Sequence, residues 1–252
     1  MAPVSDLRQR LFLIDDDLLS REVLALLAVE SGFSVESFSS GEAALAHLAN
    51  QDAERPLAIL IDMQMPDLSG DALAHQLRSV CGRKTLLLAM SGTPVLAKQI
   101  QHFDAFILKP FVMDNLRRVI AGSVPGVSLW QAPETSLPAP LQSEALNETT
   151  YESLAGSMPH DQLMQLYKMC LDDADRRIGL MREAVAKQDA ETFLRGAHSI
   201  KGCCGMVGAL ELAALAAEME ERGLPEVDDV ISYEQFMEAS GRLRRILGTL
   251  QK

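Results

Sequence analysis

The stretch LAILIDMQMP, residues 57–66, decides the fold of the first half of this chain. Its apolar run Leu57–Ile61 is short and is followed at once by the carboxylate of Asp62, which is typical of a buried strand that ends at a polar edge. Further short apolar runs lie on both sides of it in the sequence, at Leu11–Ile14, Ser34–Phe38, Leu86–Met90 and Ala105–Leu108. We therefore expect five strands.

The segments between these runs have the spacing of helices. In Leu18–Ser31, for example, Val23, Leu24, Leu27 and Ala28 recur at helical intervals. Strand and helix thus alternate five times, and such alternation predicts a parallel sheet covered by helices on both faces. The expected fold over residues 10–122 is an α/β doubly wound five-stranded parallel sheet.

The remainder of the chain has a different pattern. Residues 123–148 contain Pro125, Pro133, Pro138 and Pro140, so we expect a semi-extended linker. Residues 149–252 show long helical stretches and no strand pattern, which predicts an all-α bundle of four or five helices. One of these helices carries a continuous apolar stripe, formed by Phe193, Ala197, Ile200, Cys204 and Val207.

Composition and charge exclude several classes of partner. Acidic residues outnumber basic ones by 35 to 23 in 252 residues, and both halves of the chain are acidic. Direct binding to nucleic acid or to an anionic membrane surface is therefore not expected. No stretch approaches the roughly 20 apolar residues of a membrane span, so we expect no membrane insertion and a cytoplasmic location. The four cysteines have no metal-ligand or redox spacing, and we expect them to be buried.

Chemically active residue types follow four of the predicted strands. Asp15 and Asp16 come directly after the first strand and Asp62 after the third, and parallel strands end at a common edge of the sheet. Three carboxylates in one crevice repel each other unless a cation offsets them, and oxygen ligands suit Mg²⁺. Ser91 and Lys109 follow the fourth and fifth strands, where a hydroxyl and a cation suit phosphoryl chemistry.

Taken together in this order, these residues resemble the receiver domain of two-component response regulators, which has a flavodoxin-like fold. The resemblance covers residues 10–122 and implies that Asp62 accepts a phosphoryl group. It also implies that Mg²⁺ or Mn²⁺ is held by Asp15, Asp16, Asp62 and the backbone carbonyl of Gln64. By the same resemblance Ser91 is a switch hydroxyl, Lys109 binds the phosphoryl group, Phe106 is an aromatic side chain that reorients, and the Lys109-Pro110 bond is cis. Asp17 has no assigned role.

One segment departs from the receiver pattern. Only 18 positions separate Ser91 from Lys109, so Pro94–Phe103 must hold a shortened fourth helix. This region is the usual signalling face of receivers, and its shortening bears on docking there but not on the chemistry at Asp62. We expect His102, within this segment, to be a surface residue and not a ligand.

A second concentration of signals is the string AHSIKGCCGMVG, residues 197–208. His198 falls outside the apolar stripe of its helix, and Lys201, Gly202 and Gly205 lie one to two turns away from it. Each glycine inside a helix costs about 1 kcal/mol relative to alanine, so we expect something to approach that face closely. A neutral imidazole is a nucleophile near pH 7, and Lys201 is placed to contact the oxygens of a phosphoryl group.

This string resembles the histidine phosphotransfer (Hpt) domain, a helical bundle without an ATP site, and the likeness runs from about Asn147 to the end. The resemblance implies that His198 is phosphorylated, that Lys201 contacts the phosphoryl oxygens and that Gly202 gives clearance for a docking receiver. A receiver and an Hpt domain in one chain predict an intermediate of a two-component phosphorelay, without a kinase domain of its own. A sensor histidine kinase, hybrid kinases included, would supply the phosphoryl group, and a downstream receiver would dock at the His198 face.

Two alternatives remain at this stage. A haloacid-dehalogenase-like phosphatase would use Asp15 as nucleophile and Asp17 as acid, with Ser91 and Lys109 in the same order. Activity on p-nitrophenyl phosphate that is lost in Asp15→Asn but not in Asp62→Asn would favour it. In a binding scaffold, phosphorylation of Asp62 would alter docking by the helical domain, and His198 would never be phosphorylated.

Overall fold

A computed structural model of the chain describes residues 9–50, 55–65, 70–93, 95, 100–122, 145–225 and 231–250. The chain divides into two compact units, residues 1–134 and 135–252. The first is α/β and the second is helical, in agreement with the fold classes predicted above. Across the described ranges, no helix is both long and apolar enough to cross a lipid bilayer.

The first unit is built on a parallel sheet with the strand order β2-β1-β3-β4-β5. All five strands begin and end within one residue of the apolar runs that predict them. The strands are β1 (Arg10–Ile14), β2 (Ser34–Phe38), β3 (Ala58–Asp62), β4 (Leu86–Ser91) and β5 (Ala105–Leu108). Every residue of β3 and β4 is buried, as expected for central strands covered on both faces.

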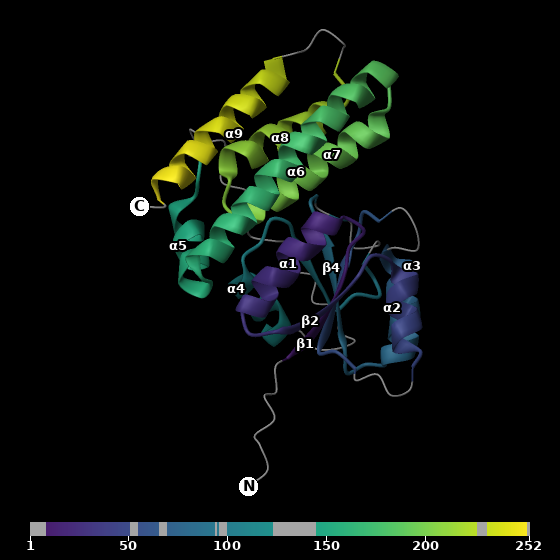
Figure 1. Ribbon diagram of the computed structural model, residues 1–252. Coiled ribbons are helices and arrows are strands. Elements are labelled where there is room, and N and C mark those ends of the chain that lie inside the picture. Colours follow the sequence, from purple (N-terminus) through teal and green to yellow (C-terminus); the bar gives the residue numbers. More distant parts are fainter. Residues whose placement is uncertain are drawn as a thin grey trace. The chain divides into compact units, whose positions relative to one another are not determined.

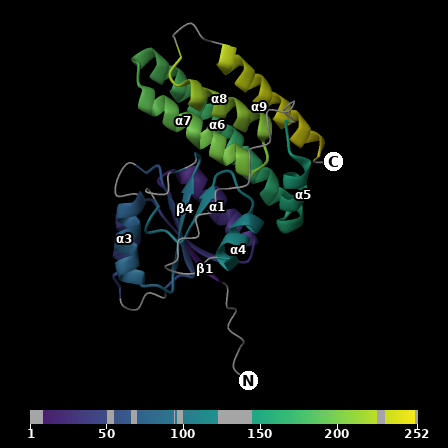
Figure 2. The same cartoon turned by 180° about the vertical axis from the view of Figure 1, so that it is seen from behind.

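Helices cover both faces of this sheet (Figure 1, Figure 2). One face carries α1 (Leu18–Glu30) and α4 (Met113–Gly122), and the other carries α2 (Gly41–Leu48) and α3 (Gly70–Cys81). The shortened helix expected within residues 94–103 falls largely on positions 94 and 96–99, which lie outside the described residues. Ile100 and Phe103, which follow them, are buried in the core on the α2 and α3 side of the sheet.

The register of the sheet places the ends of four strands side by side. Ile14 pairs with Ile61, Asp62 with Met90, and Ser91 with Leu108. The residues that directly follow or complete these strands, namely Asp15, Asp62, Ser91 and Lys109, therefore share one edge. This is the edge at which ligands of open parallel sheets bind.

The second unit is a helical bundle, in which α7 packs against both α6 and α8 (Figure 1). Its helices are α5 (Glu148–Ser157), α6 (His160–Lys187), α7 (Ala190–Met206), α8 (Leu210–Arg222) and α9 (Ile231–Thr249). The apolar stripe predicted on α7 is fully buried, which confirms that expectation. All four cysteines are buried, as expected, and none of them forms a disulfide. Most of the predicted linker, residues 123–144, lies outside the described residues.

Two helices of the bundle approach each other closely at a glycine other than those singled out from the sequence. A Cβ atom added to Gly196 on α7 would lie 2.7 Å from the side chain of Met181 on α6, so that position has no room for alanine. At Gly202 an added Cβ would meet nothing within 4 Å. Packing inside this unit therefore explains Gly196 but does not explain Gly202.

Candidate functional site

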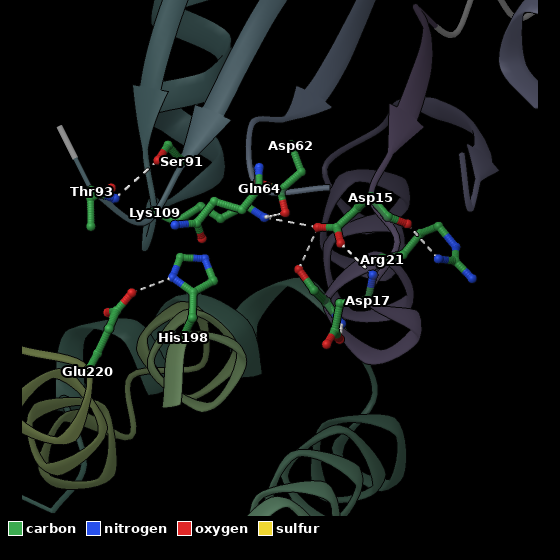
Figure 3. A network of polar contacts seen from close by, with 11 residues as sticks. Asp15, Asp17, Arg21, Asp62, Gln64, Ser91, Thr93, Lys109, His198 and Glu220 are labelled. Carbon is green, nitrogen blue, oxygen red and sulfur yellow. Dashed lines mark hydrogen bonds and ion pairs between the residues drawn. The ribbon is translucent and has the colours of Figure 1, made fainter. Parts of the chain in front are cut away.

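The structure brings the three predicted carboxylates together at the carboxyl edge of the sheet. Figure 3 shows two of them, Asp15 and Asp62. Asp15, Asp16 and Asp62 each offer an oxygen atom, and these oxygens lie within 4.8 Å of one another. Asp15 and Asp62 are buried, whereas Asp16 is exposed. A cluster of this kind is open on the side of Asp16 and enclosed on the sheet side.

Asp15 is held from three directions by the start of α1. The hydroxyl of Ser20 donates to Asp15 Oδ2 at 2.8 Å, and the backbone N–H of Asp17 donates to Oδ1 at 2.9 Å. The guanidinium of Arg21 donates to the Asp15 carbonyl at 2.6 Å. Asp17 itself caps α1 by accepting from the backbone N–H of Ser20 at 2.9 Å. The carboxylate of Asp17, to which the sequence assigned no role, therefore fixes the helix that orients Asp15.

Lys109 enters the cluster from the end of β5 and is 4% exposed. Its Nζ lies 2.9 Å from Asp15 Oδ2 and 3.3 Å from Asp62 Oδ2. Burial opposes the charged form of Lys109, but the carboxylates of Asp15 and Asp62 outweigh burial and raise the pKa of the ammonium above its ordinary value. Lys109 is therefore a cation that bridges the two buried carboxylates.

The charges of the cluster do not balance within the protein. Burial and the neighbouring carboxylates of Asp15 and Asp62 raise the pKa of Asp16, because they disfavour a further negative charge. Three carboxylates and one ammonium leave two negative charges, which one divalent cation would neutralise. An oxygen-only donor set that is open on one side suits Mg²⁺ or Mn²⁺, which retain water ligands. The residues present thus fit the expected metal.

The remaining predicted residues of the first unit surround this cluster. The backbone N–H of Gln64 donates to Asp62 Oδ1 at 3.3 Å, which places the β3–α3 turn beside Asp62 (Figure 3). The side chain of Ser91 is buried, and its Oγ accepts from the backbone N–H of Thr93 at 3.2 Å. Phe106 is partly buried and packs against the core on the α2 and α3 side. The Lys109-Pro110 bond is cis, as expected.

His102 occupies the surface position that was predicted for it. Its ring is 41% exposed, and its Nδ1 lies 2.6 Å from Asp71 Oδ2 on α3. Its backbone N–H also donates to Asp71 Oδ1 at 2.9 Å. His102 therefore ties the segment before β5 to the first turn of α3 and does not contribute to the carboxylate cluster, which is formed by Asp15, Asp16 and Asp62.

The second candidate site, in the helical unit, is a contact of three ionisable side chains, two of which, His198 and Glu220, are seen in Figure 3. His198 on α7 lies with its Nδ1 2.8 Å from Oε1 of Glu220, which is on α8. The other carboxylate oxygen of Glu220 accepts from the ammonium of Lys201. The side chains of His198, Lys201 and Glu220 are only 15%, 11% and 17% exposed. Lys201 is therefore beside His198, as predicted, but through a carboxylate that the sequence analysis did not identify.

Glu220 determines which nitrogen of a neutral His198 carries the lone pair. Burial favours the protonated form of Glu220, but hydrogen bonds from His198 and Lys201 outweigh burial and lower the pKa of its carboxyl group. An ionised carboxylate can only accept, so the Nδ1 atom of His198 carries the proton in this contact. The lone pair of a neutral His198 is then on Nε2.

Comparisons with known proteins agree with both sites. Residues 11–121 match the family model described as "Response regulator receiver domain", and residues 165–252 match the model described as "Hpt domain". The chain thus contains a receiver domain followed by an Hpt domain, the two kinds of domain through which phosphoryl groups pass in two-component phosphorelays. It belongs to the response regulator receiver family in its first unit and to the Hpt family in its second.

Several curated relatives are similar over both domains. The sensory/regulatory protein RpfC of Xanthomonas campestris pv. campestris is 25% identical over 219 residues, which cover 83% of this chain and 30% of RpfC. The sensor protein TorS of Escherichia coli is 24% identical over 215 residues, or 85% of this chain and 22% of TorS. The chain therefore spans less than a third of the length of these two relatives. The response regulator MprA of Mycobacterium sp. (strain KMS) is 32% identical over 111 residues, covering 42% of this chain and 46% of MprA.

Among solved structures, the chemotaxis protein CheY4 of Vibrio cholerae is 24% identical, with a TM-score of 0.39. The match covers 44% of this chain and 98% of CheY4.

Proposed function

We propose that this protein carries phosphoryl groups between a histidine kinase and another receiver, with Asp62 and His198 as its two phosphoacceptors. The observation that carries the proposal is the presence of two matched acceptors in one chain. Asp62 lies among two carboxylates and a lysine that suit phosphoryl transfer, and His198 is held with its Nε2 lone pair free to react.

At the receiver site, an oxygen of Asp62 would attack the phosphorus of a phosphohistidine on the donor. The bond from phosphorus to the donor nitrogen would break, and its electron pair would return to the donor imidazole. Lys109, already 3.3 Å from Asp62 Oδ2, would stabilise negative charge on the transferred phosphoryl group. A divalent metal held by Asp15, Asp16, Asp62 and the Gln64 carbonyl would neutralise the remaining negative charge.

The residues around Asp62 would then register its phosphorylation. The Ser91 hydroxyl, at the end of the neighbouring strand β4, accepts from the Thr93 N–H and would donate its own proton to a phosphoryl oxygen. Phe106 on β5, which is only partly buried, would move with it. These roles of Ser91 and Phe106 are carried over from the receiver family. The place of Ser91 at the strand edge that carries Asp62, and of Phe106 on the neighbouring strand β5, supports them.

At the Hpt site, Nε2 of His198 would accept the phosphoryl group from a phosphoaspartate. Lys201 would contact the phosphoryl oxygens, and the open space at Gly202 would let a docking receiver approach α7. The similarity to RpfC and TorS supports partners of the two-component class: a sensor histidine kinase upstream, hybrid kinases included, and a receiver downstream. The boundaries we propose are 10–122 for the receiver, 123–148 for the linker and 149–252 for the Hpt domain.

Phosphorylation by a histidine kinase in the presence of Mg²⁺ tests this function. Wild type, Asp62→Asn and His198→Gln would be compared, with acid and alkali stability of the label separating phosphohistidine from phosphoaspartate. Label on both residues, with the His198 label lost in Asp62→Asn, would establish transfer from Asp62 to His198. Label on His198 that is independent of Asp62 would mean two separately addressed domains. A His198 that no donor labels would favour the scaffold alternative.

A further inference from the structure

We infer that Glu220 is a positioning residue for both directions of phosphoryl transfer at His198, because it retains the Nδ1 proton while Nε2 gains and later loses the phosphoryl group. This role rests on the proposed function of His198 and extends it from accepting the group to passing it on. Neither the receiver site nor a docking partner is needed for the geometry that supports it.

The contact between His198 and Glu220 is constrained from both sides. One oxygen of Glu220 is 2.8 Å from Nδ1, and the other is bound by the ammonium of Lys201. Because both oxygens are engaged, the carboxylate cannot turn away from the imidazole without breaking an ion pair. The three side chains are each less than one-fifth exposed, so bulk water competes weakly for these bonds.

The proton balance of the reaction follows from this arrangement. When the Nε2 lone pair bonds to phosphorus, the donor's bond to phosphorus breaks and the ring becomes an N-phosphorylated imidazolium that still bears Nδ1–H. When an acceptor carboxylate later attacks phosphorus, the electron pair of the Nε2–P bond returns to Nε2, and the ring leaves as neutral imidazole. Neither step then exchanges a proton with water.

The charge of Glu220 favours both steps. The positive charge that develops on the ring as Nε2 bonds to phosphorus lies next to a carboxylate, which stabilises it. The same carboxylate keeps Nδ1 protonated in the phosphorylated state, and a protonated ring is the better leaving group because it departs as a neutral molecule. The charged groups that face His198 in this contact are Glu220 from α8 and, through Glu220, Lys201 from its own helix.

A charge-only substitution separates this role from a structural one. Glu220→Gln keeps an oxygen that can accept from Nδ1–H but removes the negative charge. Glu218→Gln is the matched control, because Glu218 lies on the same helix, is half exposed and pairs with Arg222. All variants would be made in the full chain carrying Asp62→Asn, and phosphoramidate, a small phosphoryl donor, would label His198 directly.

We expect Glu220→Gln to slow both formation and loss of phosphohistidine by about tenfold or more, with Glu218→Gln unchanged. The difference between the two proteins in the rate of phosphohistidine loss should become smaller as pH falls, because water then supplies the Nδ1 proton. Imidazole ¹⁵N spectra should show Nδ1–H retained after phosphorylation in the Glu220 protein and lost in Glu220→Gln. Equal rates and equal spectra in both would overturn the inference while leaving the proposed function intact. A His198 that is labelled in neither protein would instead count against the proposed function.

Discussion

Lys109→Met removes the ammonium between Asp15 and Asp62 while keeping an unbranched side chain of similar length. The Lys109 side chain is nearly inaccessible, and its Nζ lies 2.9 Å and 3.3 Å from the two carboxylates. Removing one partner of a buried ion pair leaves an uncompensated buried charge, which costs about 3–5 kcal/mol. We expect the free energy of unfolding of the receiver unit to fall by that amount in the absence of metal.

The same substitution should increase the response to Mg²⁺. Without Lys109, Asp15 and Asp62 lose the ammonium that lies 2.9 Å and 3.3 Å from their carboxylates, so a bound divalent ion relieves more repulsion than in the wild type. A ligand that binds only the folded state stabilises it by an amount that grows with the logarithm of the ligand concentration relative to its dissociation constant. Added Mg²⁺ should therefore raise the stability of Lys109→Met more than that of the wild type.

Calorimetry of the full chain measures both effects, because the unfolding transition that moves with Mg²⁺ belongs to the receiver unit. For a unit of this size, the expected loss corresponds to a decrease in melting temperature on the order of 10–20 °C. Lys84→Met, in the exposed turn before β4, is the control and should change stability by less than about 0.5 kcal/mol. A Lys109→Met transition that matches the wild type without metal, with an equal shift on adding Mg²⁺, would refute the reasoning.

Three further substitutions test other contacts. Asp16→Asn should stabilise the metal-free protein at neutral pH and abolish metal binding. The Asp16 carboxyl has a raised pKa, so the wild type loses stability as pH rises through that pKa. The difference in melting temperature between Asp16→Asn and the wild type should therefore grow with rising pH. A pH series of melting temperatures without such a divergence would contradict this. Asp17→Ala should cost about 1 kcal/mol, as loss of a helix cap does, and should leave Asp62 able to accept label; loss of labelling at full stability would speak for a chemical role. Tyr167→Phe removes a buried hydrogen bond of 2.7 Å to the carbonyl of Val207. Urea denaturation should show that the free energy of unfolding of the helical unit falls by about 1–2 kcal/mol. No change would mean that water replaces the hydroxyl.

Much of the fold could be predicted from the sequence because it depends on local periodicity. Short apolar runs with few polar residues specify buried parallel strands, and their ends place Asp15, Asp62, Ser91 and Lys109 at one edge once the strands are parallel. The apolar stripe on α7 likewise follows from a repeat of three and four residues. The requirement for glycine at Gly196, in contrast, could not be predicted, because it depends on the close approach of Met181 from another helix.

The sequence by itself determined the types of chemistry: a carboxylate acceptor with metal-binding partners in the first unit, and a histidine acceptor with a nearby lysine in the second. Only the tertiary structure decided which side chains complete these sites. Ser20 reaches Asp15 because the cap at Asp17 sets the direction of α1, and no periodic pattern encodes that bond. Glu218, Glu220 and Glu221 are equivalent as residue types. Each step along a helix rotates the side chain by about 100°, so the rotation of α8 against α7 alone directs Glu220 to His198 and Lys201.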